Sequence, residues 1–268
     1  MANNMKIKHD FHIHTHLSLC ANETATVENY LHIAKEHGLT KLGFSNHFWD
    51  EKIPGATPFY VPQNLPHLLE LKPELQAVAD PDITVYFGCE TEYVPARHDI
   101  AMAEETAEQF DYILVPNSHT HLVMPRDCYE PYQKHVDFMI QAYRDIIDSS
   151  VSKYITAIAH PFEAVGCPYD YTILMNMISD DCFKRLFDQT AEKDIAIEIN
   201  VESMHKKTEA EIASCPQLRM FRIAKECGCK FLFGSDAHDS DAHSSYDHAD
   251  FVANLLDLNE THLAKIAL

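Results

Sequence analysis

Side chains that bind metal ions follow seven successive apolar segments of this sequence. The first segment ends in His12 and His14, and the last is followed by Asp236 and His238. The segments between them are followed by His47, Glu90, His119, His160, and Glu198 with Asn200. Imidazole nitrogens and carboxylate oxygens form a ligand set that suits Zn, Mn or Fe. Residues this far apart converge only if the segments end on one rim, so the series predicts one multinuclear metal site.

Local sequence patterns support metal binding at the first segment, which carries His12 and His14, and at Glu90. His12 and His14 are two residues apart at the end of an extended segment, so their side chains point to the same face. Glu90 follows a segment in which the apolar residues from Ile83 to Phe87 alternate. A carboxylate buried beside them requires a cation to offset its desolvation. Both patterns favour a metal site over isolated polar side chains.

The apolar segments are predicted to be β-strands separated by helices. The predicted strands are 7–13, 39–46, 83–88, 111–116, 154–159, 195–200 and 230–234. Helical periodicity is predicted for 26–38, 67–79, 101–110, 132–151, 173–193, 217–228 and 247–268. Strands and helices alternate without a composition break, repeat or linker, so we assign one domain to residues 1–268.

This alternation predicts the fold class. Short strands joined by helices pair in parallel through right-handed crossovers, and about seven units favour a barrel over an open sheet. Functional groups of such barrels lie at the carboxyl ends of the strands. The candidate ligands obey that rule at every strand. We therefore predict an α/β fold, a seven-stranded (βα)7 barrel of the TIM-like kind.

The charge of the chain limits its partners. Its 268 residues include 21 Lys and Arg against 41 Asp and Glu, a formal net charge of −20. Binding of extended nucleic acid normally requires a basic stripe, so we expect no nucleic-acid partner. A small anionic substrate remains compatible, because bound cations supply the missing positive field. The sequence leaves the oligomeric state open.

Composition also bears on the cellular compartment. No segment approaches the roughly 20 apolar residues needed to cross a bilayer, and the polar N-terminus runs directly into the first strand. The eight cysteines are spread along the chain, which favours reduced thiols over a disulfide framework. We expect a cytoplasmic protein that is not bound to a membrane.

The ordered motifs of this chain resemble a known family. The segments DFHIHTHLSLC, FSNHFWD, FGCETEY, DYILVPNSH, IAHPF and FGSDAH are similar to those of the polymerase and histidinol phosphatase (PHP) family, from about residue 8 to residue 240. The length resembles the stand-alone histidinol-phosphatase-type members. The resemblance implies a distorted seven-stranded barrel, two or three divalent metal ions and hydrolysis of a phosphoester.

The resemblance also implies nine metal ligands in three groups. The first metal is expected at His12, His14, Glu90 and Asp236; the second at Glu90, His119 and His160; the third at His47, His238 and Cys20. Glu198 and Asn200 are expected to support the site rather than to bind metal directly. His121 is an alternative to His119, which we favour because it directly follows its strand.

This sequence departs from the family pattern at two positions. Cys20 stands where many members have a histidine or a carboxylate, and a thiolate suits Zn but not Mn or Mg. Whether Cys20 is a ligand is therefore open. Asn46 replaces an aspartate that often precedes the histidine at position 47, and the loss of this acceptor is expected to lower metal affinity modestly.

The expected mechanism follows from the metal ions. Two cations about 3.5–4 Å apart convert a bridging water to hydroxide near neutral pH and clamp the phosphate oxygens. Glu90 and Asp236 are assigned to catalysis as ligands of this pair. Arg126 is the candidate for binding the phosphate, with Arg97 as second choice. The group that protonates the leaving alkoxide is open among His121, His16 and metal-bound water.

We predict a metal-dependent phosphomonoesterase, with L-histidinol phosphate as the best single substrate by resemblance. A phosphodiesterase or nucleotide-type hydrolase of the same family is one alternative. A metal-binding regulatory module without catalysis is another, although an inactive site has no physical need to keep buried charged ligands.

Overall fold

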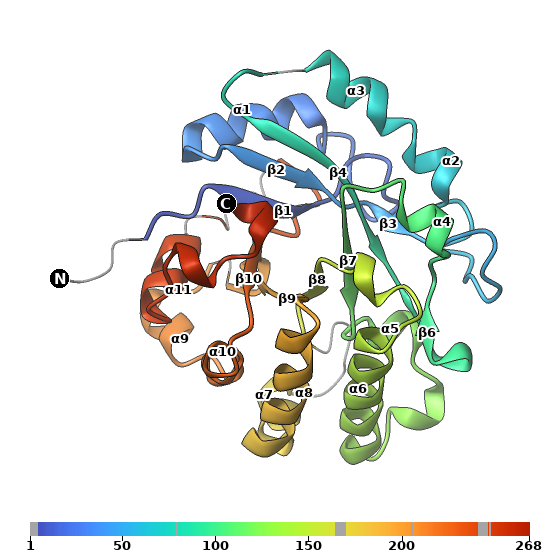
Figure 1. The fold of residues 1–268 in the computed structure, drawn as a ribbon, viewed down its shortest axis with the longest axis vertical. Helices are drawn as coiled ribbons and strands as arrows, with labels where there is room; N and C mark the ends of the chain where they lie inside the picture. Colours follow the sequence, from blue (N-terminus) through green and yellow to red (C-terminus); the bar gives the residue numbers. More distant parts are fainter. Residues whose placement is uncertain (1–4, 79, 164–169, 205, 241–245, 247) are drawn as a thin grey trace.

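Seven parallel strands form a nearly closed barrel in the computed structural model, which describes residues 5–78, 80–163, 170–204, 206–240, 246 and 248–268 (Figure 1). Each strand pairs in parallel with the next one around the barrel. In order they are β1 (His9–Ile13), β2 (Lys41–Phe44), β4 (Thr84–Thr91), β7 (Tyr112–Pro116), β8 (Ala157–Ala159), β9 (Ala196–Asn200) and β10 (Phe231–Gly234). The predicted barrel is confirmed.

The barrel closes where the first strand meets the segment after the last one. The amide of Asp236 donates to the carbonyl of His12 at 2.7 Å, and the amide of His14 donates to the carbonyl of Ala237 at 2.9 Å. These two backbone hydrogen bonds lie at the carboxyl ends of β1 and β10. Three of these four residues, His12, His14 and Asp236, are candidate metal ligands, so barrel closure positions them directly.

Below these two bonds, side chains complete the contact between β1 and β10. The amide of Phe233 donates to Nε2 of His9 at 3.1 Å, and the amide of Ser235 donates to Oδ1 of Asp10 at 3.0 Å. Burial lowers the pKa of His9 to about 3, so its ring is neutral and can accept this bond. The barrel is distorted here because side chains replace part of the backbone ladder between β1 and β10.

Helices cover the outside of the strands (Figure 1). The longer ones are α1 (Val27–His37), α6 (Tyr132–Ile147), α8 (Asp180–Glu192) and α10 (Gln217–Glu226). The shorter ones are α2 (Leu65–Leu68), α3 (Leu71–Ala77), α4 (Glu104–Ala107), α5 (Thr120–Val123), α7 (Tyr171–Met177), α9 (Glu209–Ala213) and α11 (Ala249–Leu255). Helices α1 and α8 begin where the side chains of Thr26 and Ser179 accept hydrogen bonds from backbone amides.

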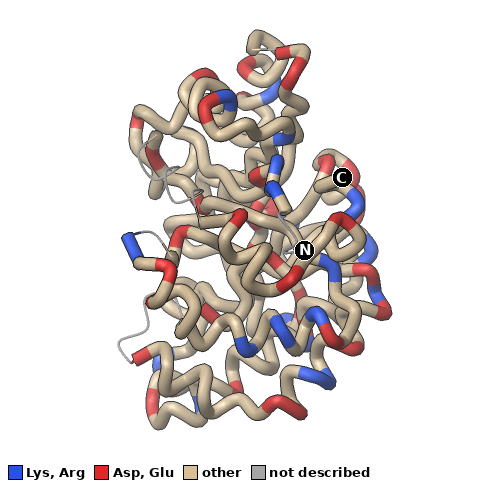
Figure 2. Tube along the Cα trace, turned by 90° about the vertical axis from the view of Figure 1, so that its left-hand side faces the viewer, with Lys and Arg blue, Asp and Glu red and all other residues tan. Residues whose placement is uncertain are grey.

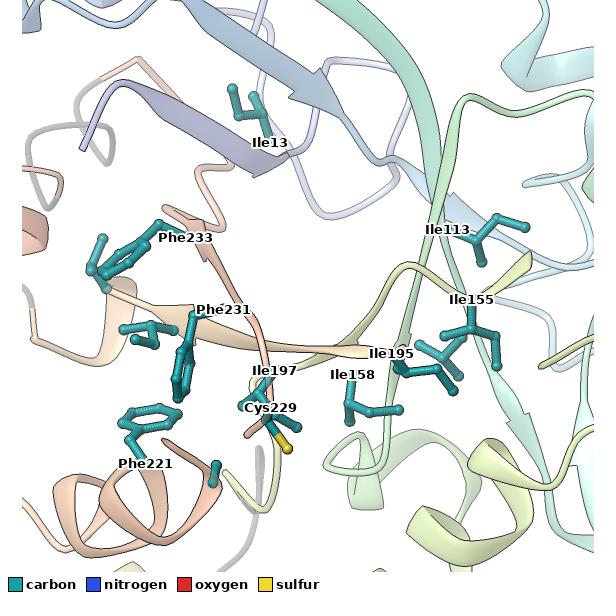
Figure 3. Close-up of a cluster of buried hydrophobic side chains, with 14 of the residues drawn as sticks. Ile13, Ile113, Ile155, Ile158, Ile195, Ile197, Phe221, Cys229, Phe231 and Phe233 are labelled. Atoms are coloured by element: carbon teal, nitrogen blue, oxygen red, sulfur yellow. The ribbon is translucent and has the colours of Figure 1, made fainter. Parts of the chain in front are cut away.

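Side chains alternate between two apolar layers along each strand. Outward-facing residues such as Ile158 and Ile197 pack under the helices, and Phe231 meets Phe221 of α10 with ring centroids 6.4 Å apart (Figure 3). The inward-facing layer consists of Phe11, Tyr112, Leu114, Ala157, Ala159, Ala196 and Leu232. This inner layer fills the lower barrel, so the interior is a packed core beneath the rim.

Two glycines make room for the largest inward side chain. A Cβ atom on Gly43 would lie 2.6 Å from the hydroxyl of Tyr112, and one on Gly88 would lie 2.2 Å from its ring. Any larger residue at either position would displace Tyr112. The small residues of β2 and β4 therefore allow one tyrosine to cross the interior below the candidate site.

Two of the predicted helices are much shorter in the structure. Only Ala249–Leu255 of the predicted helix 247–268 is α-helical, because Leu263 forms a bridge with Phe231 of β10 and holds the tail against the barrel. Residue 247 lies outside the described part of the chain. The predicted helix 101–110 is reduced to α4, because residues just before it form the antiparallel hairpin of β5 (Tyr93–Val94) and β6 (Asp99–Ile100).

Two other predicted helices are each divided in two. Segment 67–79 becomes α2, which starts earlier, and α3; Pro73 has no amide proton to donate to residue 69. Segment 173–193 becomes α7 and α8, since Ser179 caps a new helix start. The sequence analysis also missed β3 (His47–Phe48), a short strand that pairs with β4.

The distribution of acidic residues and the state of the cysteines agree with what the composition predicted. Asp and Glu are spread along the whole chain rather than confined to one region (Figure 2). None of the described helices combines the length and the hydropathy of a membrane-spanning segment. The seven described cysteines are free thiols, and Cys167 lies outside the described residues.

Candidate metal centre

The carboxylate of Glu90 is the centre of the site at the carboxyl ends of the strands. Its Oε1 lies 3.0 Å from Nε2 of His160 and 3.6 Å from Nε2 of His119. Its Oε2 lies 2.9 Å from Nδ1 of His47, and 3.6 and 3.5 Å from Nε2 of His12 and His14. Five imidazoles from other segments thus surround one carboxylate whose side chain is fully buried.

His12 and His14 form a pair whose Nε2 atoms face each other at 3.1 Å. Oδ1 of Asp236 lies 3.3 Å from the first nitrogen and 3.2 Å from the second. Burial lowers the pKa of both rings, but the charges of Glu198, Asp236 and Glu90 raise that of His12 well above its usual range. The pKa of His14 stays well below that range, because His238 and His47 add to the effect of burial.

Oε1 of Glu90 is shared by a second group. His119 and His160 both direct Nε2 toward this oxygen, and their ring centroids are 5.0 Å apart. Burial lowers the pKa of His160, yet the hydrogen bond and charge of Glu90 raise it to about 9. Glu90 therefore stands between two sets of histidines, as a bridging ligand must.

A third group lies on the other side of His14. Donor atoms of His14, Cys20, His47 and His238 all lie within 4.8 Å of one another. The ring of His14 stacks on that of His238 with centroids 4.2 Å apart. Cys20 is exposed, whereas His14 and His47 are buried, so this group opens to the surface. The structure brings Cys20 close enough to join a metal site.

The donor atoms of the cluster fit divalent cations. Nδ1 of His47 and Oε2 of Glu90 are buried and have no hydrogen-bond partner in the described part of the chain, although they are only 2.9 Å apart. Burial alone would raise the pKa of Glu90, but the charges of His119, His12 and His47 hold it well below its usual range. Unpaired buried donors aimed at a common point are satisfied by a cation.

Residues 10–202 match the PHP domain family. This chain belongs to that family. It is also 22% identical, over 94% of its length and 88% of the relative, to a protein of Clostridium acetobutylicum described as a probable phosphatase. A solved structure of the histidinol phosphate phosphatase of Lactococcus lactis, in complex with Zn, L-histidinol and phosphate, is similar at 19% identity and a TM-score of 0.68. That likeness covers 94% of this chain and 95% of the Lactococcus chain, and it supports the barrel fold.

Buried carboxylates orient two of the histidines in this PHP site. Oε1 of Glu198 lies 2.7 Å from Nδ1 of His12, and its Oε2 accepts the amide of His160 at 2.5 Å. Oε2 of Glu92 lies 2.9 Å from Nδ1 of His119 and accepts the hydroxyl of Tyr60 at 2.6 Å. Such contacts fix the ring orientation and raise the basicity of a ligating imidazole.

Hydroxyl groups hold two other rings of the PHP site. Oγ of Ser118 lies 2.6 Å from Nδ1 of His160, and Oγ of Ser18 lies 3.1 Å from Nδ1 of His14. Ser18 in turn donates to Oδ1 of Asn46 at 2.8 Å. Asn46 therefore still supplies an acceptor behind the ligands, although it replaces the aspartate of the family pattern.

The backbone is strained at two residues of the PHP site. Asp236 has φ 52° and His160 has φ 24°, in the left-handed region that non-glycine residues rarely adopt. Beside them, a Cβ atom on Gly234 would lie 2.2 Å from Oε1 of Glu198 and 2.4 Å from Cβ of His12. The end of β10 therefore requires a glycine so that the ligand of β1 and its supporting carboxylate can approach.

Four other residues predicted for the PHP site are not among the side chains that surround Glu90. His121 is exposed on α5, with its ring centroid 5.8 Å from that of His119. Arg126 is exposed in the 3-10 turn Arg126–Cys128, and Arg97 is exposed too. His16 pairs with Glu74 of α3 at 3.4 Å. Within the described residues, no hydrogen bond or ion pair joins either arginine to the cluster.

Sequence reasoning missed several supporting residues. Glu92, Ser18, Ser118 and Tyr60 were not proposed, although each contacts a ligand or its partner. Only Glu92 could have been predicted from the sequence, because it lies two residues after Glu90 and so is on the same face of the strand. The hydroxyl groups of the others come from loops and gave no pattern.

Proposed function

We propose that this protein is a metal-dependent phosphomonoesterase, with L-histidinol phosphate as its best single substrate. The observation that carries the proposal is the position of Glu90 between the His12–His14 pair and the His119–His160 pair. A bridging carboxylate places two cations at the short separation used for in-line attack on phosphoesters. Membership of the PHP family and the phosphatase names of the similar proteins support the same reaction class.

The proposed ligands follow the three groups of the cluster. They are His12, His14, Glu90 and Asp236 for one ion, Glu90, His119 and His160 for a second, and His14 or Asp236 with Cys20, His47 and His238 around a third position. Histidine and cysteine donors favour Zn over Mn or Fe at the third position. When bound, the ions activate a water and neutralise charge on the phosphoryl group.

The residues of the chain have separate roles in this proposal. Glu198 and Glu92 hold the protons on Nδ1 of His12 and His119, so that each Nε2 faces the ions. Arg126 is proposed to bind the phosphate and His121 to protonate the leaving alkoxide. Both lie on the exposed segment after β7, beside the rim.

Hydrolysis of three esters tests this function. The protein is incubated with Zn, Mn or Fe in turn, and p-nitrophenyl phosphate is compared with its bis ester and with L-histidinol phosphate. We expect hydrolysis of both monoesters, with the higher kcat/KM for L-histidinol phosphate. Preference for the bis ester would replace the proposal with a phosphodiesterase. Bound metal without hydrolysis of any ester would contradict an enzyme.

A further inference from the structure

A cavity opens at the end of the barrel opposite to the metal cluster. Its volume is about 960 Å³, and its walls are the residues before β1, the start of β2 and the C-terminal segment 259–268. His9, the first residue of β1, lines it, whereas His12 and His14 lie at the other end of this strand. Binding sites for small molecules have volumes of about 300–1,000 Å³. This cavity is therefore large enough for a metabolite and separate from the metal site.

The cavity is basic although the chain is strongly acidic. Lys6, Lys8 and Lys41 line it, and Glu260 is the single acidic side chain among the described residues that do so. The whole chain, in contrast, has 21 Lys and Arg against 41 Asp and Glu. Blue segments that mark Lys and Arg lie near the C-terminus in Figure 2. The local excess of lysine favours an anionic ligand, because it reverses the charge ratio of the whole protein.

Lys8 is the lysine of this cavity that remains available to a ligand. Nζ of Lys6 forms an ion pair with Oδ2 of Asp250 at 2.6 Å, and Nζ of Lys41 donates to the carbonyl of Ile266 at 3.0 Å. Nζ of Lys8 makes no hydrogen bond or ion pair with any described residue. The ammonium group of Lys8 can therefore pair with an anion without breaking a contact that stabilises the fold.

Two neutral donors accompany this lysine. His9 is only 1% exposed, and its Nε2 accepts the amide of Phe233 at 3.1 Å. Burial lowers the pKa of His9 to about 3, so the neutral ring carries its proton on Nδ1. Oδ1 of Asn259 accepts the amide and the hydroxyl of Thr261 at 2.9 and 2.6 Å, which leaves Nδ2 of Asn259 to donate. Neither Nδ1 nor Nδ2 has an acceptor in the described part of the chain, and both residues line the cavity.

Apolar side chains form another part of the wall. Met5 and Leu263 belong to the hydrophobic core, and both line the cavity together with Ala267. An anion that also carries a carbon skeleton would contact both kinds of wall, whereas a bare inorganic ion would leave the apolar part in water. The lining therefore fits an organic anion better than a simple ion.

We propose that this cavity is a second ligand site, which binds a small organic phosphate. The phosphate group pairs with Lys8, His9 and Asn259, and the organic part contacts Met5 and Leu263. Lysine binds phosphate as a point charge, and donors from three separate segments match the several acceptor oxygens of a phosphate. A long polyanion such as nucleic acid is disfavoured by the net charge of −20. This inference goes beyond the proposed phosphatase function and does not depend on hydrolysis.

Lysine labelling locates the bound ligand on the protein. Metal-loaded protein is acetylated with and without adenosine 5′-diphosphate (ADP), and the labelling rate of each lysine is measured by mass spectrometry. At an ADP concentration about ten times the dissociation constant, mass action predicts that labelling of Lys8 slows about tenfold. Lys153 is the internal control, because its side chain is 65% exposed and it does not line the cavity. We expect adenosine, which lacks phosphate, to protect neither lysine and inorganic phosphate to protect Lys8 less than ADP.

Four labelling results would overturn the inference. The first is an unchanged rate for Lys8 at saturating ADP. The second is equal protection of Lys8 and Lys153, which would show non-specific adsorption of the anion. The third is equal protection by adenosine, which would remove the phosphate from the interaction. The fourth is equal protection by inorganic phosphate, which would reject an organic ligand.

A substitution tests the same contact without labelling. ADP is titrated into metal-loaded wild-type protein, Lys8→Gln and the matched control Lys153→Gln by calorimetry. We expect Lys8→Gln to weaken one class of binding site by about 5- to 10-fold, and Lys153→Gln to bind as wild type does. Binding to the metal ions is common to all three proteins, so only the cavity distinguishes them. Equal dissociation constants in wild type and Lys8→Gln would refute the site, whether or not any ester is hydrolysed.

Discussion

Replacing Glu198 by glutamine should weaken metal binding without unfolding the barrel. The carboxylate is fully buried and holds two donors at once, Nδ1 of His12 at 2.7 Å and the amide of His160 at 2.5 Å. A glutamine side chain offers one oxygen and one NH₂ group, so one of these donors would face another donor. An unpaired buried donor costs about 1–3 kcal/mol, and loss of an outer-shell partner typically costs about 10- to 100-fold in metal affinity.

Chelator competition measures this effect directly. Glu198→Gln and wild-type protein are titrated with Zn against a chromophoric chelator, and bound metal is counted by mass spectrometry. We expect the affinity to fall on the order of 10- to 100-fold and turnover to recover largely at saturating Zn. The control is Glu23→Gln, which removes the same charge from an exposed position. An affinity within twofold of wild type would refute the role of Glu198 in orienting His12.

Four further predictions follow from the same geometry. Glu90→Ala should lose at least one ion and the hydrolytic activity, whereas full occupancy with turnover would disprove the bridging role. Cys20→Ser should lower Zn stoichiometry and remove the thiolate-to-metal absorption of the cobalt-substituted protein; if both stay unchanged, Cys20 is not a ligand. Gly234→Ala should destabilise the protein by about 1–3 kcal/mol through overpacking and reduce metal occupancy, and a wild-type denaturation midpoint would contradict this. Because the pKa of His160 is raised to about 9, its stabilisation of metal-free protein is complete below about pH 6.5 and lost as the pH rises through 9. A metal ion must displace the proton of His160, so metal affinity should rise by up to about tenfold per pH unit between about pH 6.5 and 9. Calorimetry of metal binding at pH 7.5 that detects no proton release would contradict this expectation.

The barrel was predictable because its strands are short apolar runs that alternate with segments of helical periodicity. The errors came from tertiary contacts that override local preference. Leu263 is held against Phe231 rather than continuing a helix, and the hairpin of β5 and β6 ends directly before the predicted helix 101–110, of which only α4 forms. A single sequence does not reveal such pairings, because both partners look ordinary in isolation.

The convergence of most candidate ligands was predictable because they lie at or just after the carboxyl ends of strands, whereas Cys20 was suggested only by the family resemblance. Glu198 was expected to support the site, whereas the contacts of Glu92, Ser18 and Ser118 with the ligand rings were not predicted, because they join separate segments and leave no spacing pattern.

The two hydrogen bonds that join His12 to Asp236 and His14 to Ala237 have a consequence for biosynthesis. The first proposed metal position includes residues from both ends of the barrel, so residue 236 must be synthesised before residue 12 could share an ion with it. Contacts of such long sequence separation are slow to form, because loop-closure entropy opposes them. Metal capture should therefore be a final step that locks a finished barrel, and a truncated chain that lacks β10 should fail to retain the ion at this position.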